Sequence, residues 1–360
     1  MAMLSNKETF SKINQIFEEL KVEGIITNNP FSLRYISGFT GGEGFLLLTK
    51  NKNYLLTDSR YTIMAKEEAK GFKVIEIKKA YTEHLNSLFE QESIRYIGFE
   101  GNHLTYDTYV RMHEKLNVEE MVSVGLRLEL LRMIKSADEI EKLRKAEHIG
   151  DIAFGRILEV IKPGMTELEV AAHLEYYMKM SGAQGLSFDT IAASGLNSAK
   201  PHAIPGTKKL ENGDFLTMDF GCIYDGYCSD MTRTIVVGKA SYEQKKVYNT
   251  VLEAQKRALE AVHAGVKGCE VDKIARDYID CAGYAGCFGH GLGHSVGLYI
   301  HEEPRFSPKE ERIIEENVIM TVEPGIYIED FGGVRIEDMI VVKEGGYENL
   351  THSPKELIEI

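Results

Sequence analysis

The sequence lacks any run of apolar residues long enough to cross a membrane as a helix. Its opening residues, MAMLSNKETFSKINQIF, have no apolar core followed by small residues at a cleavage site, so they do not fit a secretory signal. We therefore expect a cytoplasmic protein with no membrane partner.

Positive charge is also scarce. The chain has 42 Lys and Arg residues against 55 Asp and Glu residues, which gives a formal net charge of −13. A nucleic-acid-binding surface needs a basic stripe, and this balance argues against one. Nucleic acid is thus not an expected partner.

Cysteine is too sparse and too irregular for a structural framework. The sequence has no Cys-x-x-Cys pair, and its five cysteines are an odd number: Cys222, Cys228, Cys269, Cys281 and Cys287. Such a set predicts buried thiols in a reducing compartment, and neither a disulfide framework nor a zinc knuckle.

The composition that remains, 43% apolar and 27% charged, is that of a soluble globular protein. A length of 360 residues predicts two domains or one large α/β domain.

The first part has an amphipathic helix at 7–20, followed by short apolar runs at 24–27, 44–49, 54–57, 73–77 and 95–100. This alternation predicts an α/β domain. The glycine-rich stretch SGFTGGEG has the wrong spacing for a nucleotide-binding motif, and we interpret it as a structural loop.

The second part begins with a long amphipathic helix, KSADEIEKLRKAEHIGDIAF, whose start has a capping-box pattern at Ser136 and Glu139. We place the domain boundary between residues 125 and 136.

The second part contains an internal repeat, in which residues 161–182 and 262–283 align without gaps. Five identities are shared: Gly164, Glu169, Val170, Tyr177 and Gly182 match Gly265, Glu270, Val271, Tyr278 and Gly283. The common register predicts two related halves that bring distant segments to one centre.

Two aspartates interrupt a predicted hairpin, LTMDFGCIYDGYCSDMTRTIVV. The Asp-Gly pair at 225–226 is a strong turn signal, and counting outward from it pairs Asp219 with Thr232. Asp230 lies two residues from Thr232, so the two aspartates share one face with Cα atoms about 7–8 Å apart. Carboxylates this close repel each other, so one stays protonated unless a cation intervenes. The pattern alone also allows one aspartate to be a solvated edge residue.

The segment FGHGLGHSVGLYIHEEPRF contains three histidines, His290, His294 and His301, and glycines flank the first two. It lacks the glutamate of a zinc-protease His-Glu-x-x-His helix. Glycine lets the backbone come close to an ion or a substrate. A single histidine is more often an ordinary core or surface residue, but three in one glycine-rich segment favour a binding site.

Two further carboxylates lie in apolar segments. VIMTVEPGIYIED and GGVRIEDMIVV each predict a buried strand, the first containing Glu323 and the second Glu337. Glutamate is rarely buried unless it is paired or binds a metal. Arg335 lies two residues from Glu337 and would share its strand face.

Together these segments supply four carboxylates and one imidazole: Asp219, Asp230, His294, Glu323 and Glu337. This oxygen-rich set suits a pair of divalent ions such as manganese, cobalt or zinc. Two ions about 3.5–4 Å apart would lower the pKa of a shared water and polarise a substrate carbonyl. The pattern therefore favours hydrolysis.

At these residues the sequence resembles the pita-bread metallopeptidases, specifically the Xaa-Pro peptidases (prolidase and aminopeptidase P). The resemblance covers the whole chain and rests on YISGFTG and LLTDSRY in the first part and on MDFG…YCSDMTRT, GHGLGH, VEPGIY and RIED in the second. It implies an α/β (α+β) fold. A creatinase-like N-terminal α/β domain would occupy residues 1–130, and a pseudo-twofold pita-bread catalytic domain would occupy residues 131–360.

The resemblance also implies roles for the metal ligands. Asp219 would bind one metal ion through both oxygens, and Asp230 and Glu337 would bridge the pair. His294 and Glu323 would complete the second metal site. Glu323 would also be the general base for a bridging water, whose hydroxide attacks the peptide bond.

Further residues would face the substrate. His290 and His301 would contact the substrate carbonyl and stabilise the tetrahedral intermediate. His202, in KPHAIPG, would line the substrate pocket. Arg335 would steady the site beside Glu337, and Tyr327 would belong to the same surrounding layer of substrate-binding residues.

Two close relatives fit less well. Creatinase shares the architecture but lacks the metal ligands. Methionine aminopeptidase shares the ligands, but it is shorter and usually has Gln at the position of Arg335.

A prolidase must hold the free carboxylate of a dipeptide, and Arg305 lies where some prolidases place a carboxylate-binding arginine. We therefore expect a Xaa-Pro dipeptidase that acts on proline-containing dipeptides or short peptides. Aminopeptidase P, which removes the N-terminal residue of longer peptides, is the alternative. A non-catalytic peptide-binding module on the same fold is a third hypothesis, and the intact ligand set weighs against it.

The resemblance implies a cofactor and an assembly as well. The cofactor would be two divalent metal ions per subunit, with Mn²⁺ expected before Co²⁺ or Zn²⁺. The assembly would be a homodimer in which the N-terminal domain of one subunit borders the site of its partner.

Overall fold

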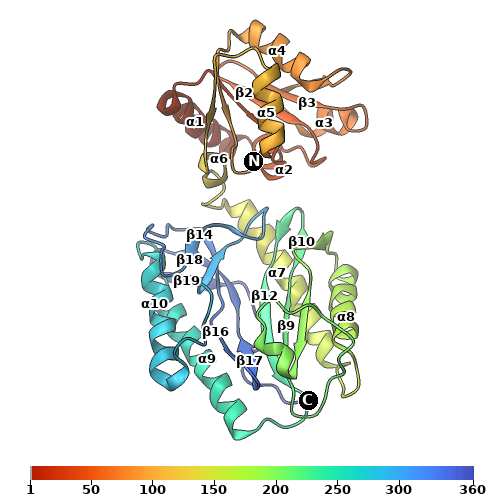
Figure 1. Ribbon diagram of the computed structural model, residues 1–360, viewed down its shortest axis with the longest axis vertical. Helices are drawn as coiled ribbons and strands as arrows, with labels where there is room; N and C mark the ends of the chain where they lie inside the picture. The colour runs from red at the N-terminus through yellow and green to blue at the C-terminus, as the bar shows by residue number, and fades with distance from the viewer. Residues whose placement is uncertain (1) are drawn as a thin grey trace. The chain divides into compact units, whose positions relative to one another are not determined.

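The N-terminal unit is built on a mixed six-stranded sheet. The structure is a computed structural model that describes residues 2–360, and the chain divides into two compact units, Met1–Arg132 and Met133–Ile360. The sheet of the first unit has the order β4-β3-β2-β1-β5-β6, with antiparallel β1–β2 and β2–β3 pairs and parallel pairs elsewhere (Figure 1). Its strands are β1 (Gly24–Thr27), β2 (Phe45–Thr49), β3 (Asn53–Thr57), β4 (Phe72–Glu76), β5 (Tyr96–Phe99) and β6 (Glu120–Ser123). The five strands predicted from the sequence are confirmed, each to within one residue at either end.

Helices cover both faces of this sheet. They are α1 (Ala2–Leu20), α2 (Pro30–Ser37), α3 (Thr62–Glu68), α4 (Tyr81–Glu92), α5 (Tyr106–Lys115) and α6 (Arg127–Leu130). Ile25 belongs to the core formed with α1, α2 and α3, whereas its neighbour Ile26 belongs to the core formed with α4 and α5. The two isoleucines belong to different cores because successive side chains of a strand point to opposite faces of the sheet. The unit is therefore a three-layer α/β domain.

The C-terminal unit consists of two halves, each with two long helices and a set of mostly antiparallel strands. The first half contains α7 (Ala137–Leu158), α8 (Glu167–Met180), β7 (Gly185–Leu186), β8 (Ile191–Ser194), the 3-10 helix η1 (Gly195–Ala199), β9 (Phe215–Phe220), β10 (Cys222–Tyr224), β11 (Tyr227–Cys228) and β12 (Met231–Val236). The second half contains α9 (Tyr242–Ala261), α10 (Gly268–Ile279), the π-helical turn η2 (Asp280–Tyr284), β13 (Gly293–Ser295), β14 (Glu302–Phe306), β15 (Ile319–Val322), β16 (Gly325–Ile328), β17 (Gly332–Arg335), β18 (Asp338–Lys343) and β19 (Gly346–Asn349). In this unit α8 lies at the right of Figure 1 and α9 and α10 lie at the left, with strands between them.

The helix α7 begins as the sequence predicts. The hydroxyl of Ser136 accepts a hydrogen bond from the backbone N–H of Glu139, and the carboxylate of Glu139 accepts one from the backbone N–H of Ser136. This reciprocal capping box satisfies two donors that the first helical turn would otherwise leave unpaired.

The predicted internal repeat corresponds to equal turn geometry in the two halves. Gly164 and Gly265 precede α8 and α10 with φ angles of 92° and 101°. Gly182 and Gly283 follow the same helices with φ angles of 109° and 96°. Glycine adopts these left-handed conformations without the steric cost of a side chain. The matched glycines are therefore explained by the turns that enter and leave each helix.

The predicted hairpin register is confirmed. Tyr224 lies opposite Tyr227, and Asp219 lies opposite Thr232. The hairpin differs from the expectation in one respect, because an irregular stretch separates β9 from β10 and β11 from β12. Asp230 lies in that stretch, directly before β12.

The two halves meet along a seam of hydrogen bonds between β12 and the segment around β17. The hydroxyl of Thr234 donates to the carbonyl oxygen of Arg335 at 2.9 Å, and the N–H of Glu337 donates to the carbonyl oxygen of Thr232 at 3.1 Å. This seam places the hairpin of the first half beside the carboxylates of the second.

The strand assignments of two glutamates need correction. Glu323 lies between β15 and β16, and Glu337 lies between β17 and β18, so neither is inside a strand. Pro324 follows Glu323 and has no N–H to continue a ladder. The N–H of Glu337 bonds across the seam instead of within a sheet of its own half. Arg335 and Glu337 therefore do not belong to one strand, although both side chains bond the hydroxyl of Thr232 and line one cavity.

The cysteines are free, and the expectation that they are buried holds only in part. Cys222 and Cys228 are buried, Cys269 and Cys287 are partly buried, and Cys281 is exposed. Cys281 lies in η2, beyond Ile279, the last buried residue of α10.

Among the described residues, no helix combines the length and the apolar character that crossing a membrane requires.

Two glycines of the GHGLGH segment provide a test of the packing. A Cβ atom added at Gly293 would lie 2.0 Å from the carbonyl oxygen of Thr321, because β13 packs closely against β15. We expected glycine here to let the backbone approach an ion or a substrate. For Gly293 this expectation is wrong, because the backbone of Thr321 occupies the space that a side chain would fill. A Cβ atom added at Gly289 would meet nothing within 4 Å.

We predict that Gly293→Ala lowers the free energy of unfolding by roughly 1–3 kcal/mol through overpacking. Gly289→Ala, the matched control, should change it by less than about 0.5 kcal/mol. Urea denaturation measures both values. Equal effects of the two substitutions would contradict the close approach of β13 to β15.

Candidate active site

A cavity of about 560 Å³ in the C-terminal unit contains nearly all of the predicted site residues. Its walls include the five predicted metal ligands together with His202, His290, His301, Arg305 and Arg335. Tyr327 is the one predicted site residue that is absent from the described lining. The lining also contains apolar side chains, among them Phe188, Ile191 and Ile300.

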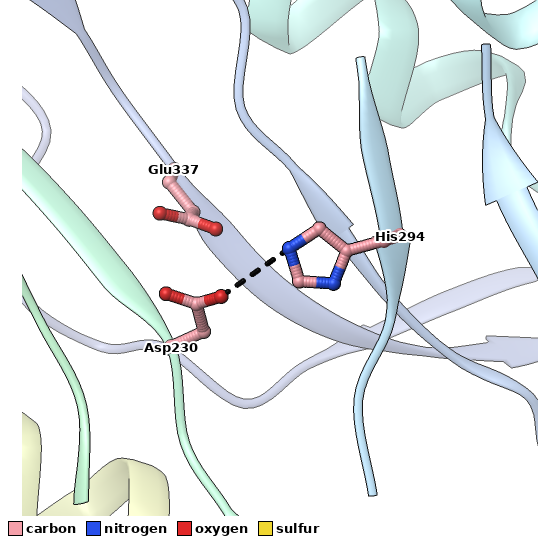
Figure 2. A group of neighbouring side chains, drawn as sticks. All are labelled: Asp230, His294 and Glu337. Atoms are coloured by element: carbon pink, nitrogen blue, oxygen red, sulfur yellow. Dashed lines mark ion pairs between the residues drawn. The ribbon is translucent and has the colours of Figure 1, made fainter. Parts of the chain in front are cut away.

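Asp230, His294 and Glu337, which all line this cavity, form a compact group of side chains (Figure 2). One potential ligand atom from each lies within 4.8 Å of the others, and all three residues are buried. Asp230 precedes β12 in the first half, whereas His294 on β13 and Glu337 before β18 belong to the second half. The fold thus brings together three donors from distant parts of the sequence.

The other two predicted ligands lie around this group. The carboxylate oxygen Oε1 of Glu323 is 3.5 Å from Nε2 of His294 and accepts a hydrogen bond from the hydroxyl of Thr321 at 3.1 Å. Asp219 is held by Arg335, whose Nη2 donates to its Oδ2 at 2.6 Å. One oxygen of Asp219 is therefore already paired with a cation of the protein.

The protonation of His294 suits it to bind a cation. Its Nδ1 donates to the carbonyl oxygen of Ser295 at 3.1 Å, and burial lowers the pKa of the ring to about 3. The ring is neutral, so Nε2 presents a lone pair toward Asp230 Oδ2 and Glu323 Oε1, each 3.5 Å away. A lone pair that faces two carboxylate oxygens is repelled unless a cation lies between them.

The buried carboxylates also lack enough neighbouring positive charge to offset their own. Burial, followed by repulsion from neighbouring carboxylates, raises the pKa of Asp230 and of Glu337 well above the usual values. Burial also raises the pKa of Glu323 to about 7. Glu337 Oε1 and Asp219 Oδ1 are buried and have no hydrogen-bond partner among the residues that the structure describes. Oxygen donors with these properties, together with one imidazole, fit divalent metal ions.

Thr232, which the sequence analysis did not select, connects several of these groups. Its hydroxyl donates to Glu337 Oε2 at 2.6 Å and accepts from Arg335 Nε at 3.0 Å. It also lies opposite Asp219 in the hairpin register, which was the signal that could have identified it. Thr232 thus orients one carboxylate and one guanidinium at the site.

Tyr327 connects Arg335 with His290. Arg335 Nη1 donates to the phenol oxygen of Tyr327 at 2.8 Å, and the phenol lies 2.9 Å from His290 Nε2. His290 Nδ1 donates to the carbonyl oxygen of Gly291, and burial lowers the pKa of this histidine to about 4. Both ring nitrogens of His290 are therefore engaged within the protein, while His301 is exposed to the cavity.

A buried ion pair next to His301 was also missed. Lys135 Nζ lies 2.9 Å from Glu302 Oε2, and both side chains are almost fully buried. Glu302 also accepts from the backbone N–H of Tyr299, which fixes the loop that precedes His301. The partners are 167 residues apart and match no motif, so sequence spacing could not have paired them.

Comparisons with known proteins identify the family. The model of metallopeptidase family M24 matches residues 141–344, and that of the creatinase/prolidase N-terminal domain matches residues 10–134. The Xaa-Pro dipeptidase of Pyrococcus furiosus is 41% identical over 353 residues, which cover 98% of this chain and 100% of that protein.

Two solved structures have the same fold over their full lengths. A Xaa-Pro dipeptidase from Bacillus anthracis has a TM-score of 0.96 and 42% identity, covering 99% of this chain and 100% of that chain. An X-Pro aminopeptidase from Thermotoga maritima MSB8 has a TM-score of 0.89 and 39% identity, covering 96% of this chain and 100% of that chain.

The family match shows that the chain is a metal-dependent hydrolase, and the buried donors that line the cavity have the chemistry that such an enzyme needs. The chain belongs to metallopeptidase family M24, with a creatinase-type N-terminal α/β domain followed by a pita-bread catalytic domain. The resemblance inferred from the sequence motifs is thereby confirmed. Membership of this family implies divalent metal ions, and Asp230, His294 and Glu337 provide a buried group suited to them.

The raised pKa of Glu323 predicts how the stability of the metal-free protein depends on pH. An acid whose pKa is higher in the folded state stabilises that state only while it is protonated. For Glu323 this contribution is complete below about pH 4.5 and is lost as the pH rises to about 7. Compared with Glu323→Gln, which does not titrate, the metal-free wild type should lose on the order of 2–3 kcal/mol between pH 4.5 and 8.

Urea denaturation of both metal-free proteins at several pH values measures this difference. A difference in stability that stays constant across the range would contradict the shifted pKa. Divalent metal should stabilise the wild type most at the high end of the range, because protons then no longer compete for the carboxylates.

Proposed function

We propose that this M24 enzyme is a Xaa-Pro dipeptidase that hydrolyses the bond before proline in dipeptides. The observation that supports this most is a cation, Arg305, on the wall of the cavity that the four carboxylates of the predicted metal site also line. A dipeptide substrate has a free carboxylate close to its scissile bond, and a guanidinium matches that group in charge and geometry.

The neighbours of Arg305 leave most of its hydrogen-bonding capacity available. Its Nε lies 3.4 Å from Glu303 Oε1, a long contact. Glu303 also pairs with Arg312, which in turn binds Glu310. Arg312 offsets one of these two negative charges, and the contact of Arg305 with Glu303 through Nε leaves its two terminal nitrogens to act on the cavity. Arg305 accordingly contributes to the lowered pKa of His301, although burial is the larger cause.

The metal ligands would be the five residues named from the sequence: Asp219, Asp230, His294, Glu323 and Glu337. They would hold two divalent ions, for which we propose Mn²⁺. When bound, such ions supply an activated water and polarise the substrate carbonyl. The assignment of Asp219 implies that Arg335 shares this carboxylate with a metal ion, since one of its oxygens accepts from the guanidinium.

Other side chains of the chain would handle protons and position the substrate. Glu323 would act as the general base, because its carboxylate is buried at the cavity and has a pKa of about 7. His301 would donate a hydrogen bond to the developing oxyanion, and His202 would contact the substrate at the mouth. His290 already bonds the phenol of Tyr327 and the carbonyl oxygen of Gly291. To contact the substrate, it would have to replace its bond to Tyr327 with one to the substrate.

Aminopeptidase P activity is the second candidate. The T. maritima relative, named an X-Pro aminopeptidase, is nearly as similar to this chain as the two dipeptidases. A non-catalytic binding module is less well supported, because the acid, imidazole and guanidinium groups of the site are all in place. The homodimer implied by the resemblance stays a prediction.

We predict that Arg305→Met raises KM for Leu-Pro by about 10- to 100-fold, the cost of losing a charge-assisted hydrogen bond to the carboxylate. Leu-Pro amide, which lacks that carboxylate, should be hydrolysed equally by both proteins. Arg305→Lys should recover part of the loss, since it keeps the charge but loses the fork geometry.

Steady-state kinetics with these substrates, together with an Arg-Pro-Pro peptide, test the proposal. The dipeptidase predicts efficient cleavage of Leu-Pro by the wild type. Strong cleavage of the longer peptide alone, or an Arg305→Met variant with unchanged KM for Leu-Pro, would contradict it.

A further inference from the structure

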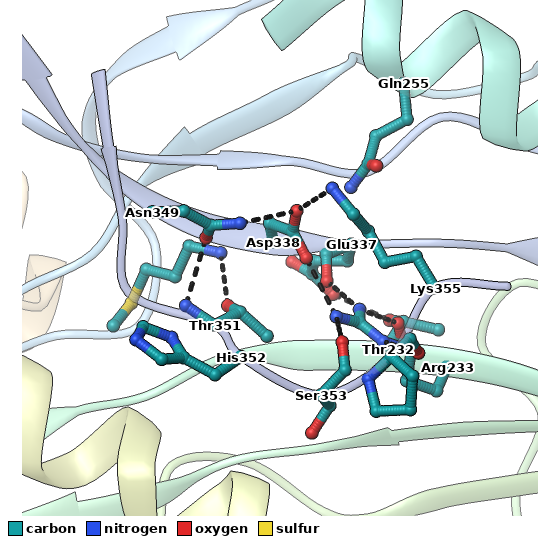
Figure 3. Close-up of polar contacts among 12 residues, drawn as sticks. Thr232, Arg233, Gln255, Glu337, Asp338, Asn349, Thr351, His352, Ser353 and Lys355 are labelled. Carbon is teal, nitrogen blue, oxygen red and sulfur yellow. Dashed lines mark hydrogen bonds and ion pairs between the residues drawn. The ribbon is translucent and has the colours of Figure 1, made fainter.

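Asp338, the residue after Glu337, is fully buried and is held by three side chains (Figure 3). Its Oδ1 accepts from Arg233 Nη2 at 2.9 Å. Its Oδ2 accepts from Lys355 Nζ at 2.6 Å and from Asn349 Nδ2 at 3.0 Å. Two of these partners, Asn349 and Lys355, come from the stretch 349–355, which begins with the last residue of β19.

Arg233 extends these contacts to the backbone of the metal site. Its guanidinium is 1% exposed and donates to the carbonyl oxygens of Thr232 and Glu337. The same guanidinium donates to the carbonyl oxygens of Ser353 at 2.8 Å and Pro354 at 3.1 Å. The backbone of Glu337 is therefore tied to the C-terminal segment through one buried cation.

A second route joins the same segment to Asp230. Glu147, on α7, is fully buried. Its Oε1 accepts from the hydroxyl of Thr351 at 2.6 Å, and its Oε2 accepts from the backbone N–H of Asp230 at 3.3 Å. Thr351 is separated from Glu147 by 204 residues, so this link depends entirely on the tertiary fold.

From these contacts we propose that residues 349–355 are a positioning element for the metal centre. Through Lys355 and Thr351 they fix the backbone of Glu337 and Asp230, one from each half of the unit. The proposal rests on the metal-binding role proposed above for these two residues. It assigns a function to a segment that contributes no ligand of its own.

Two physical arguments favour positioning over a purely structural role. Asp230 and Glu337 both lie outside regular strands, so ladder hydrogen bonds alone do not fix them. A buried ion pair such as Arg233–Asp338 adds little net stability, because the cost of desolvation offsets the attraction. Metal ligands, in contrast, depend strongly on the groups that orient them.

Lys355→Met tests the first route. Among the contacts of the described residues, the ammonium of Lys355 binds Asp338 and reaches neither Asp230 nor Glu337, and methionine keeps the apolar stem while removing the ion pair. We expect Co²⁺ to bind this variant roughly 10-fold more weakly than the wild type, at the low end of the effect of altering groups that orient ligands. The visible absorption spectrum of the bound Co²⁺ should change, and Lys355→Arg should restore both properties.

Thr351→Val tests the second route, and two variants serve as controls. Thr351→Val removes the hydroxyl that donates to Glu147, and we expect a similar loss of Co²⁺ affinity. Lys245→Met removes an ion pair with Glu359, also near the C-terminus, and Thr250→Val removes a buried hydroxyl that bonds within α9. Neither control contact reaches a proposed ligand, so their Co²⁺ affinity should stay within about twofold of the wild type.

Titration of each metal-free protein with Co²⁺, together with its thermal melting curve, separates the outcomes. A wild type that binds no Co²⁺ would overturn the proposed metal site itself. If the wild type binds Co²⁺, but Lys355→Met and Thr351→Val melt earlier with unchanged affinity and spectrum, the segment is only structural and the proposal is wrong. The two substitutions remove different side-chain contacts, so one folded variant is sufficient for the test. Failure of both to fold would make the segment a folding element and would also overturn the proposal.

Discussion

Mutual repulsion among buried carboxylates is the constraint on which the C-terminal unit depends. Asp219, Asp230, Glu323 and Glu337 face one cavity, and Arg335 is the only arginine that pairs directly with one of them in the described network. Burial raises the pKa of each acid, and the neutral ring of His294 adds a lone pair to the cluster instead of a charge. An arrangement this unfavourable by itself is explained if the folded protein is completed by divalent cations.

The pseudo-twofold architecture explains how such a cluster can be assembled. Each half contributes strands that end or break at the seam, and the breaks allow acidic side chains to leave the ladder and enter the cavity. Asp230 comes from the first half, and His294 and Glu337 come from the second. The surrounding threonines and arginines orient these side chains without adding ligands. The hydroxyl of Thr232 donates to Glu337, and the hydroxyl of Thr321 donates to Glu323. Arg233 donates to the backbone carbonyl oxygen of Glu337.

Local signals predicted the parts of the structure that local physics determines. The Asp-Gly turn at 225–226 set the register that pairs Asp219 with Thr232, and the capping box at Ser136 set the start of α7. Glu323 and Glu337 line the cavity together with the other predicted ligands, but the sequence wrongly placed them within strands, because periodicity does not reveal where a ladder breaks. Long-range polar links such as Lys135–Glu302 could not be predicted, since they depend on tertiary packing between segments without a shared motif.

We propose that Asp230 and Glu337, with their neighbours, hold two metal ions between them. Counting the Mn²⁺ ions bound per chain by equilibrium dialysis of the metal-free protein tests it most directly, in the wild type and in a variant with Asp230→Asn and Glu337→Gln. The account predicts two ions in the wild type and the loss of at least one in the variant. Equal stoichiometry in both proteins, or no bound ion in the wild type, would contradict it.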